Sequence, residues 1–504
     1  MLSAAQAAEA LCANAPGTMV MRMLTIESLP VVAGARPFIG HLQALRSDRL
    51  ALLDRMANEV DRVSRMRSLG NFPMIAINHP EVLQELLIER ARVFEKSAMV
   101  RFALNPLVGE GLFTSRGELW RRQRRLMAPL FQPSKIAGFG ADMVACTDRA
   151  LADWRDGEAR TLLRETTRIT MSVAGKTLFR ADTFGEADEI GRALTIALDF
   201  AAANSPSALS LAHIVASRLF RALAKLAPWA SVFARIAKRL ERPWLVPGRA
   251  GRELRESILF LDGTVQKMID ARRAMPPDDG TGDLLSRLLS VRDEEAHDGM
   301  TDKQVRDEIL TLFVAGHETT ATALAWSIYL LCRNPHIYEE VQREVDALGR
   351  APTAEDLPKL ALTLRAFKES LRLYPPVYFD GRQAEAQVVL DGVTYPEGTV
   401  AMFAPYSLHR RPERWPDPER FDPDRFLPAA EAARSRFDWL PFGIGPRVCI
   451  GMGFALMEGQ LVLARMLQQA RFALVDSEAE PPMPSATLRP SRGVPVRITL
   501  RKKI

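Results

Sequence analysis

Residues 442–451 read FGIGPRVCIG and hold one cysteine, Cys449, in a glycine-rich loop. Gly443 and Gly445 can take backbone angles that other residues avoid, and Pro446 stiffens the turn, so the loop can direct its backbone amides toward the sulfur. The segment that follows has helical periodicity, which places Cys449 just before a helix N-terminus, where free N–H groups favour negative charge. The pattern indicates a loop that positions an anionic sulfur ligand. A buried structural cysteine is the alternative.

The composition of the 504-residue chain is that of a globular protein with a large core. The chain is 47% hydrophobic and 25% charged, which excludes a disordered protein. Its four cysteines lie far apart and form no C-x-x-C pair, which indicates a reducing, cytoplasmic location. The net charge of +6 arises from interspersed residues of both signs, so it does not by itself indicate a nucleic-acid partner.

The chain contains no repeat, low-complexity tract or long linker that would divide it. We therefore predict a single domain over residues 31–504, preceded by a poorly ordered extension over residues 1–30. The extension lacks the basic start of a secretory signal. Polar residues interrupt the uncharged run at 200–217, so no transmembrane segment is expected.

Hydrophobic periodicity predicts a mainly α protein with small β-sheets, in the α+β class. Apolar residues recur at helical spacing over 80–93, 138–155, 252–273, 302–332 and 363–373. Short strand-like stretches occur at 73–77, 386–390 and 398–403. The turn residues Asp391 and Gly392 predict a hairpin between the last two strands.

FGIGPRVCIG matches, position for position, the haem-ligand loop Phe-x-x-Gly-x-Arg-x-Cys-x-Gly of the cytochrome P-450 haem-thiolate monooxygenases. Further stretches resemble this family in its own order from about residue 35 to the C-terminus. The chain is identified as a bacterial-type soluble member of the family. The resemblance implies the cytochrome P-450 fold, with a long central helix over a haem b (iron protoporphyrin IX) and the cysteine loop on the opposite face.

The sequence AGHETT at 315–320 resembles the family's oxygen-activation segment. Ala315 and Gly316 would leave room above a planar cofactor, and the Thr319 hydroxyl can bond back to the carbonyl of Ala315 and loosen the helix there. The resemblance implies that Thr319 and Glu318 are catalytic, as a water-orienting hydroxyl and a proton-relaying acid. An exposed polar patch is the alternative, but the apolar flanks favour a buried helix.

Other matched motifs imply structural and cofactor-binding roles. Glu369 and Arg372 in ESLR, with Arg425 in FDPDRF, resemble the family's structural triad, which we assign to folding and haem incorporation. His409, in SLHRR, is expected to be structural. The residues expected to contact the haem are Trp120, Arg124, Ala315, Arg382, Phe442, Arg447, Cys449 and Gly451, with Cys449 as the axial ligand of the iron.

The substrate pocket is expected to be apolar, which suits a fatty acid, terpenoid or steroid-like molecule. By resemblance it is lined by residues 98–113 with Phe313, Ala315, Thr319, Val377 and Tyr378. The segment 218–242, with Arg235, Lys238, Arg239 and Arg242 on one helical face, resembles the lid over the substrate channel. A solvated basic face is preferred there over contact with a membrane surface.

Arg121, Arg122 and Arg125 lie on the predicted helix of Arg124, which in the family borders the cysteine side of the haem, where electron donors dock. An acidic ferredoxin or flavodoxin with its own reductase would suit this surface and would pass on electrons from NAD(P)H. The chain itself shows no flavin or iron–sulfur module, and a monomer is expected.

The sequence therefore predicts an oxidoreductase that inserts one atom of O2 into an apolar small molecule by hydroxylation or epoxidation. Two alternatives stay open. A peroxide-driven or isomerising relative would keep the haem and change the reaction, and a haem sensor or carrier would catalyse nothing. The intact pair Glu318 and Thr319 favours the oxygen-activating enzyme.

Overall fold

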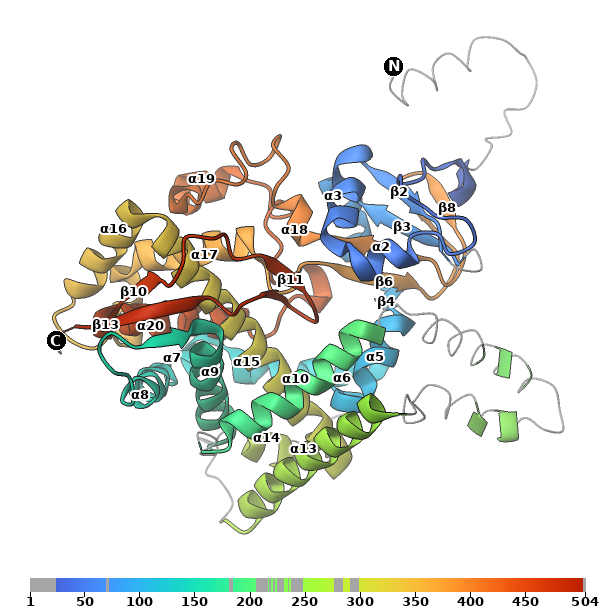
Figure 1. Ribbon diagram of the computed structural model, residues 1–504. Coiled ribbons are helices and arrows are strands. Elements are labelled where there is room, and N and C mark those ends of the chain that lie inside the picture. Colours follow the sequence, from blue (N-terminus) through green and yellow to red (C-terminus); the bar gives the residue numbers. More distant parts are fainter. Residues whose placement is uncertain are drawn as a thin grey trace, which may run out of the picture.

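The computed structural model describes residues 24–68, 72–180, 185–204, 248–275, 284–290 and 299–501, together with a few positions between 216 and 236 (Figure 1). The helices are α2 Leu42–Ser47, α3 Arg49–Glu59, α4 Pro80–Gln84, α5 Ala98–Val108, α6 Gly117–Met127, α7 Pro133–Ala137, α8 Gly140–Leu151, α9 Leu162–Phe179, α10 Ala187–Asn204, α13 Arg249–Arg273, α14 Leu284–Ser290, α15 Asp302–Arg333, α16 Pro335–Asp346, α17 Ala361–Leu373, α18 Pro405–Leu408, α19 Pro428–Ala433 and α20 Met452–Gln469. The strands are β1 Leu24–Thr25, β2 Val63–Met66, β3 Met74–Ile77, β4 Phe94–Lys96, β5 Ala159–Thr161, β6 Asp380–Ala384, β7 Val388–Leu390, β8 Val393–Tyr395, β9 Val400–Phe403, β10 Ala470–Leu474, β11 Pro482–Pro484, β12 Leu488–Pro490 and β13 Pro495–Leu500. The prediction of a mainly α protein with small sheets is confirmed.

The largest sheet joins parts of the chain that are far apart in sequence. Its strand order is β2-β3-β9-β6-β4, with β3 and β9 parallel and the other neighbours antiparallel. Strands β3 and β9 are buried along their whole length, which explains their continuous apolar sequences. In Figure 1 these strands, with α2 and α3, form one lobe beside the helical body.

The hairpin predicted at Asp391 and Gly392 exists, but its second strand was assigned wrongly. Both turn residues have positive φ, 50° and 72°, as a two-residue hairpin turn requires. Such a turn must be followed at once by its partner strand, and β7 pairs with β8 rather than with residues 398–403. The latter form β9, which lies between β3 and β6 in the five-stranded sheet.

Helix α15 is the central helix of the helical body. It begins with a capping box formed by Thr301 and Gln304, and nearly all of its residues from Val305 to Leu331 are buried. The hydroxyls of Thr166 and Thr170 on α9 donate to carbonyl oxygens of α15 over 2.9 and 3.0 Å. Helix α9 thereby fixes the register of the central helix.

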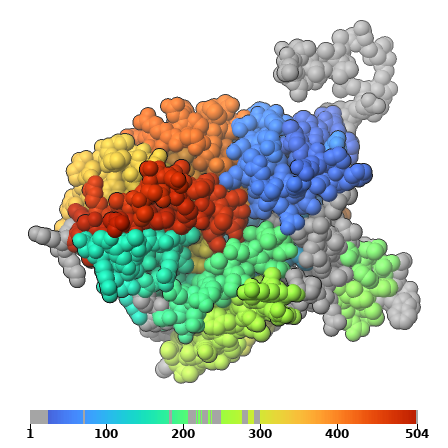
Figure 2. All heavy atoms as spheres, in the orientation of Figure 1, coloured from blue at the N-terminus to red at the C-terminus, as the bar shows by residue number. Residues whose placement is uncertain are grey.

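The other predicted helices are found with small changes at their ends, except for 80–93. There α4 continues as a π-helical turn over Glu85–Glu89, and the chain leaves it to form β4. In Figure 2 the teal α8 and α9, the green α10 and the red C-terminal segment form much of the visible face of the helical body.

The predicted N-terminal boundary and the basic lid segment fall largely on residues that are not described. Leu24 and Thr25 already belong to the fold, because β1 pairs with β8, whereas residues 1–23 lie outside the described chain. Most of the segment 218–242 also lies outside it. Among the helices that are described, none is long and apolar enough to cross a membrane.

The predicted triad is assembled at a buried junction. Arg372 and Glu369 are fully buried and pair twice, at 2.7 and 2.8 Å. The Arg372 guanidinium also donates to the carbonyl oxygens of His409, Pro418 and Arg420. Arg425 lies 3.4 Å from the Glu369 carboxylate. The triad therefore ties α17 to the long irregular segment that leads to the cysteine loop.

We predict that Arg372→Ala lowers the free energy of unfolding by about 3–5 kcal/mol, because it leaves the Glu369 carboxylate without its main buried partner. Urea denaturation measures this change. Arg365→Ala on the same helix is the matched control. It removes an ion pair with the exposed Asp424 and should cost less than about 1 kcal/mol. Equal losses in both variants would contradict the role of the buried pair.

Candidate functional site

Cys449 ends a tight loop whose backbone folds back on itself. Its N–H donates to the carbonyl oxygen of Phe442 over 2.9 Å. Gly445 has a φ of 77° and lies so close to the carbonyl of Leu87 that a Cβ would overlap it, which explains the glycine. Gly451 is the N-cap residue of α20. The predicted position of Cys449 just before a helix N-terminus is confirmed.

The Cys449 thiol is accessible to solvent, although protein atoms enclose it on most sides. Burial raises the pKa of the thiol, and a hydrogen bond from the Gly451 backbone together with the charge of Arg124 offsets only part of that effect. The Gly451 amide therefore favours the thiolate, as expected of this loop, but burial outweighs it in the protein alone. A thiolate at this depth needs a cation in direct contact, and a metal ion that coordinates a thiol deprotonates it.

The middle of α15 is less buried than the rest of the helix. Ala315 is exposed and Gly316 and Thr319 are half-buried, whereas the neighbouring His317 and Glu318 are buried. The Thr319 hydroxyl donates to the carbonyl oxygen of Ala315 over 2.7 Å, as predicted. The helix continues without a break from Asp302 to Arg333, so this bond does not interrupt it.

These accessible side chains fit a haem. Helices α15 and α20 pack against each other and are otherwise mostly buried, so accessible surface on them is surface that a bound group can cover. Cys449 offers a sulfur ligand, while Ala315 and Gly316 add little bulk and Thr319 adds a single hydroxyl. A planar group with a thiolate-bound metal needs this combination.

Two basic side chains, Arg447 of the cysteine loop and Arg124 of α6, have donors to spare. The Arg447 guanidinium pairs with Glu95, donates to the carbonyl oxygen of Ser115 over 2.9 Å, and lies 4.1 Å above the ring of Trp120. One of its nitrogens is buried with no partner in the described part of the chain. Arg124 forms no ion pair with a carboxylate among the described residues, and burial lowers its pKa. Donors without partners suit the carboxylates of a ligand.

A second basic pair lies on neighbouring strands. Lys96 on β4 and Arg382 on β6 are directly opposite each other, and like charges in that register repel. Asp380 lies between them and pairs with both, at 2.9 and 2.7 Å. Burial lowers the pKa of Lys96 to about 8 against the attraction of Asp380. Arg447 lies within electrostatic reach of Lys96 and Arg382, and these three cations pair with two carboxylates, Asp380 and Glu95. The uncompensated positive charge suits the carboxylates of a bound group.

The structure places Glu318 in an ion pair. Its carboxylate lies 2.6 Å from Arg489 and accepts a hydrogen bond from Thr487 over 2.8 Å. Burial raises the pKa of this carboxyl, but Arg489 and His317 outweigh burial, so the net pKa lies below the ordinary value. No hydrogen bond joins Glu318 to Thr319 in the described chain.

Arg489 also connects the buried acid to α10. It lies 3.1 Å from Asp199, which accepts a further hydrogen bond from the Ser485 hydroxyl. Arg489 and Lys96 are two cations near the site that the sequence analysis missed. Arg489 is 171 positions from Glu318 along the chain, and no local pattern connects the two.

The predicted pocket residues differ in their surroundings. Val377 is 39% exposed, in keeping with a lining position. The Phe313 ring is stacked on Phe179 in the main core, with ring centres 4.6 Å apart. Tyr378 is buried, and its hydroxyl accepts a hydrogen bond from Arg49 over 2.5 Å. The part of these two aromatic rings in a pocket stays a prediction.

Comparison with known proteins agrees with this geometry. The family model "Cytochrome P450" matches residues 30–496. Cyclooctatin synthase of Streptomyces melanosporofaciens is 33% identical, over 92% of this chain and 95% of its own, and pentalenene oxygenase of Streptomyces avermitilis is 32% identical, over 93% and 96%. The solved haem domain of cytochrome P450DA has a TM-score of 0.78 at 24% identity, over 94% of this chain and 98% of its own. The chain belongs to the cytochrome P450 family and is a haem-dependent oxidoreductase that incorporates one oxygen atom into its substrate.

Proposed function

We propose that this enzyme hydroxylates or epoxidises a terpenoid-like small molecule with O2 and electrons from a separate ferredoxin or flavodoxin. The main support is the accessible face of α15. Ala315, Gly316 and Thr319 form this face, and none of them is charged. Such a face suits an apolar substrate. Among fatty acids, terpenoids and steroid-like molecules, the terpenoid is favoured because similar chains are named for cyclooctatin and pentalenene. The cysteine pattern supports a cytoplasmic location, and a monomer is part of the proposal.

When bound, haem supplies the chemistry that splits O2 and oxidises a C–H or C=C bond. The Cys449 sulfur would bind the haem iron. Arg124, Arg382 and Arg447 would hold the haem carboxylates, with Lys96 as a fourth cation. Trp120 supports the Arg447 guanidinium through its ring. Phe442 and Gly451 shape the backbone on either side of the cysteine.

Thr319 and Glu318 are the proposed proton-handling residues. The Thr319 hydroxyl gives its hydrogen to the Ala315 carbonyl, so its oxygen remains free to accept a hydrogen bond from a water on the accessible side. Glu318 is held by Arg489 and Thr487. A proton relay through this carboxylate therefore requires that it turn away from Arg489, and Arg489 is a positioning residue in the proposal.

We predict that Thr319→Ala keeps its haem but lowers product formation by roughly 10- to 1000-fold, since the residue that orients the proton-carrying water is lost. Reductant should then be spent on hydrogen peroxide. Product, peroxide and NAD(P)H are measured together, with a terpenoid that shifts the haem absorption as substrate.

Thr322→Ala is the matched control for this measurement. Its hydroxyl lies on the same helix, buried and without a partner in the described chain, so coupling should stay at the wild-type value. Full coupling in Thr319→Ala would show that protons reach the site by another route. Turnover of wild type with peroxide alone, at the rate seen with NAD(P)H and partner proteins, would favour the peroxide-driven alternative.

The electron donor is proposed to dock on α6. Arg121 and Arg125 are exposed on this helix, and Arg124 on the same helix faces Cys449. A negatively charged donor would be attracted to this surface and brought close to the cysteine side of the site. Arg122 is half-buried and donates to the carbonyl oxygen of Gly299, so the exposed Arg121 and Arg125 are the better positions to change. Arg121 also pairs with Glu118.

We predict that reversing both charges, Arg121→Glu with Arg125→Glu, slows reduction of the haem by an acidic ferredoxin roughly tenfold or more at low salt. Added salt should slow the wild type toward the variant, because it screens the encounter. Stopped-flow reduction measures both rates. Arg343→Glu, on the exposed face of α16, is the control and should change little. A double variant as fast as wild type at low salt would place docking elsewhere.

A further inference from the structure

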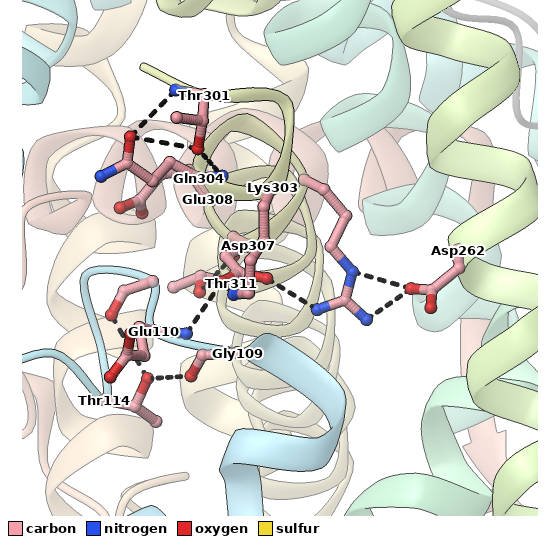
Figure 3. Close-up of polar contacts among 12 residues, drawn as sticks. Gly109, Glu110, Thr114, Asp262, Thr301, Lys303, Gln304, Asp307, Glu308 and Thr311 are labelled. Atoms are coloured by element: carbon pink, nitrogen blue, oxygen red, sulfur yellow. Dashed lines mark hydrogen bonds and ion pairs between the residues drawn. The ribbon is translucent and has the colours of Figure 1, made fainter. Parts of the chain in front are cut away.

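Two neighbouring carboxylates fasten the loop at residues 109–114 to the start of α15, and Figure 3 shows the contact of the first, Asp307, with Glu110. The Asp307 carboxylate accepts a hydrogen bond from the Glu110 N–H over 3.0 Å. The Glu308 carboxylate accepts one from the Leu112 N–H over 2.9 Å. Two successive side chains of one helix therefore hold alternate backbone amides of one loop.

The glycines of this loop permit the contact. Gly109 has a φ of 55°, and a Cβ there would collide with the Asp307 carboxylate. A Cβ on Gly111 would collide with the Thr311 hydroxyl and the Asp307 carbonyl. The sequence GEG at 109–111 is thus fitted to the surface of α15, and no other side chain has room at either glycine.

The loop covers a part of α15 that leads directly to the haem-facing segment. Glu308 is seven residues before Ala315, two helical turns along the same face. At its other end the loop leads to Ser115, whose carbonyl oxygen accepts from Arg447. A change in the contact between the loop and α15 would therefore affect both the Ala315 segment and Arg447.

The two carboxylates differ in their charge partners. Asp307 pairs with Lys303 and Arg306, and Arg306 also donates to Asp262 of α13 over 2.7 Å. Glu308 has no cationic partner in the described chain, and one of its oxygens is buried without any hydrogen bond. Cations therefore neutralise the charge of Asp307, whereas no cation in the described part of the chain would neutralise a charge on Glu308.

We propose that Asp307 and Glu308 form a latch that holds loop 109–114 closed on α15, and that Glu308, the member without a cation, is the point at which this latch is released. Asp307 fixes the position of the loop. Glu308 keeps the latch closed while it carries a proton, and loss of that proton favours the open loop.

The surroundings of Glu308 support this division of roles. Burial, with a smaller effect from Asp307, raises the pKa of Glu308 from 4.5 to about 8, against the hydrogen bond from Leu112. Asp307 is the charged side chain that acts on Glu308, and it pairs with Lys303 and Arg306 of the same helix, while Arg306 also donates to Asp262 on α13. None of the cations pairs with Glu308 itself.

The direction of the pH effect follows from these positions. In the open state Glu308 meets water, and its pKa returns toward the ordinary value. Between that value and about 8, the open state is ionised while the closed state keeps its proton. Each pH unit in this window therefore weakens the latch roughly tenfold. Above about 8 both states are ionised, and the effect levels off.

Hydrogen–deuterium exchange of the haem-loaded wild-type enzyme tests the proposal without any substrate or turnover. Protection of the peptide that spans 109–114, corrected for the intrinsic exchange rate, reports the closed-to-open ratio. We expect it to fall roughly tenfold per pH unit between pH 6 and 8 and then to level off. Protection that does not change with pH in wild type would overturn the proposal.

Glu308→Gln separates the titration from the contact. The amide oxygen can still accept from Leu112, so the loop should stay protected with no dependence on pH. Asp302→Asn is the control, because it removes an exposed carboxylate that pairs with Arg273 on the first turn of the same helix. It should keep the wild-type slope. A wild-type slope in Glu308→Gln would assign the titration to another group and overturn the role of Glu308.

Discussion

The enclosure of the Cys449 sulfur is the constraint on which the rest of the site depends. Burial favours the neutral thiol, and neither the Gly451 amide nor Arg124 reverses that preference. A metal ion in contact with the sulfur resolves the conflict, because it stabilises the thiolate directly. The tight loop, the N-cap at α20 and the buried pair of Glu369 and Arg372 together hold the sulfur where this contact can form.

Helix α15 carries three separate tasks along its length. Its first turns hold loop 109–114, its middle turns leave Ala315 and Thr319 accessible, and Glu318 is turned aside into an ion pair with Arg489. The threonines of α9 fix the register of the same helix. Because α15 is one continuous helix, a displacement of its first turns also moves the accessible segment around Ala315.

The parts that the sequence predicted are those in which neighbouring residues carry the signal. The cysteine loop, the buried helix with AGHETT and the pair in ESLR are local patterns with a direct physical meaning. Lys96, Arg489 and the contact of Asp307 and Glu308 with the 109–114 loop were missed, because each acts across 171 or more positions of sequence. The second strand of the hairpin was assigned wrongly for a related reason. The three residues of β8 were too short a pattern to recognise beside the longer apolar stretch of β9.

X-ray absorption at the iron edge of the haem-loaded enzyme tests the central claim most directly. The account predicts one sulfur atom in the first coordination shell of the iron in wild type and its loss in Cys449→Ala. Cys332→Ala removes a thiol that contacts the Phe472 carbonyl oxygen and should retain the sulfur signal. A first shell of nitrogen and oxygen alone in wild type, or a sulfur signal that survives in Cys449→Ala, would contradict the assignment.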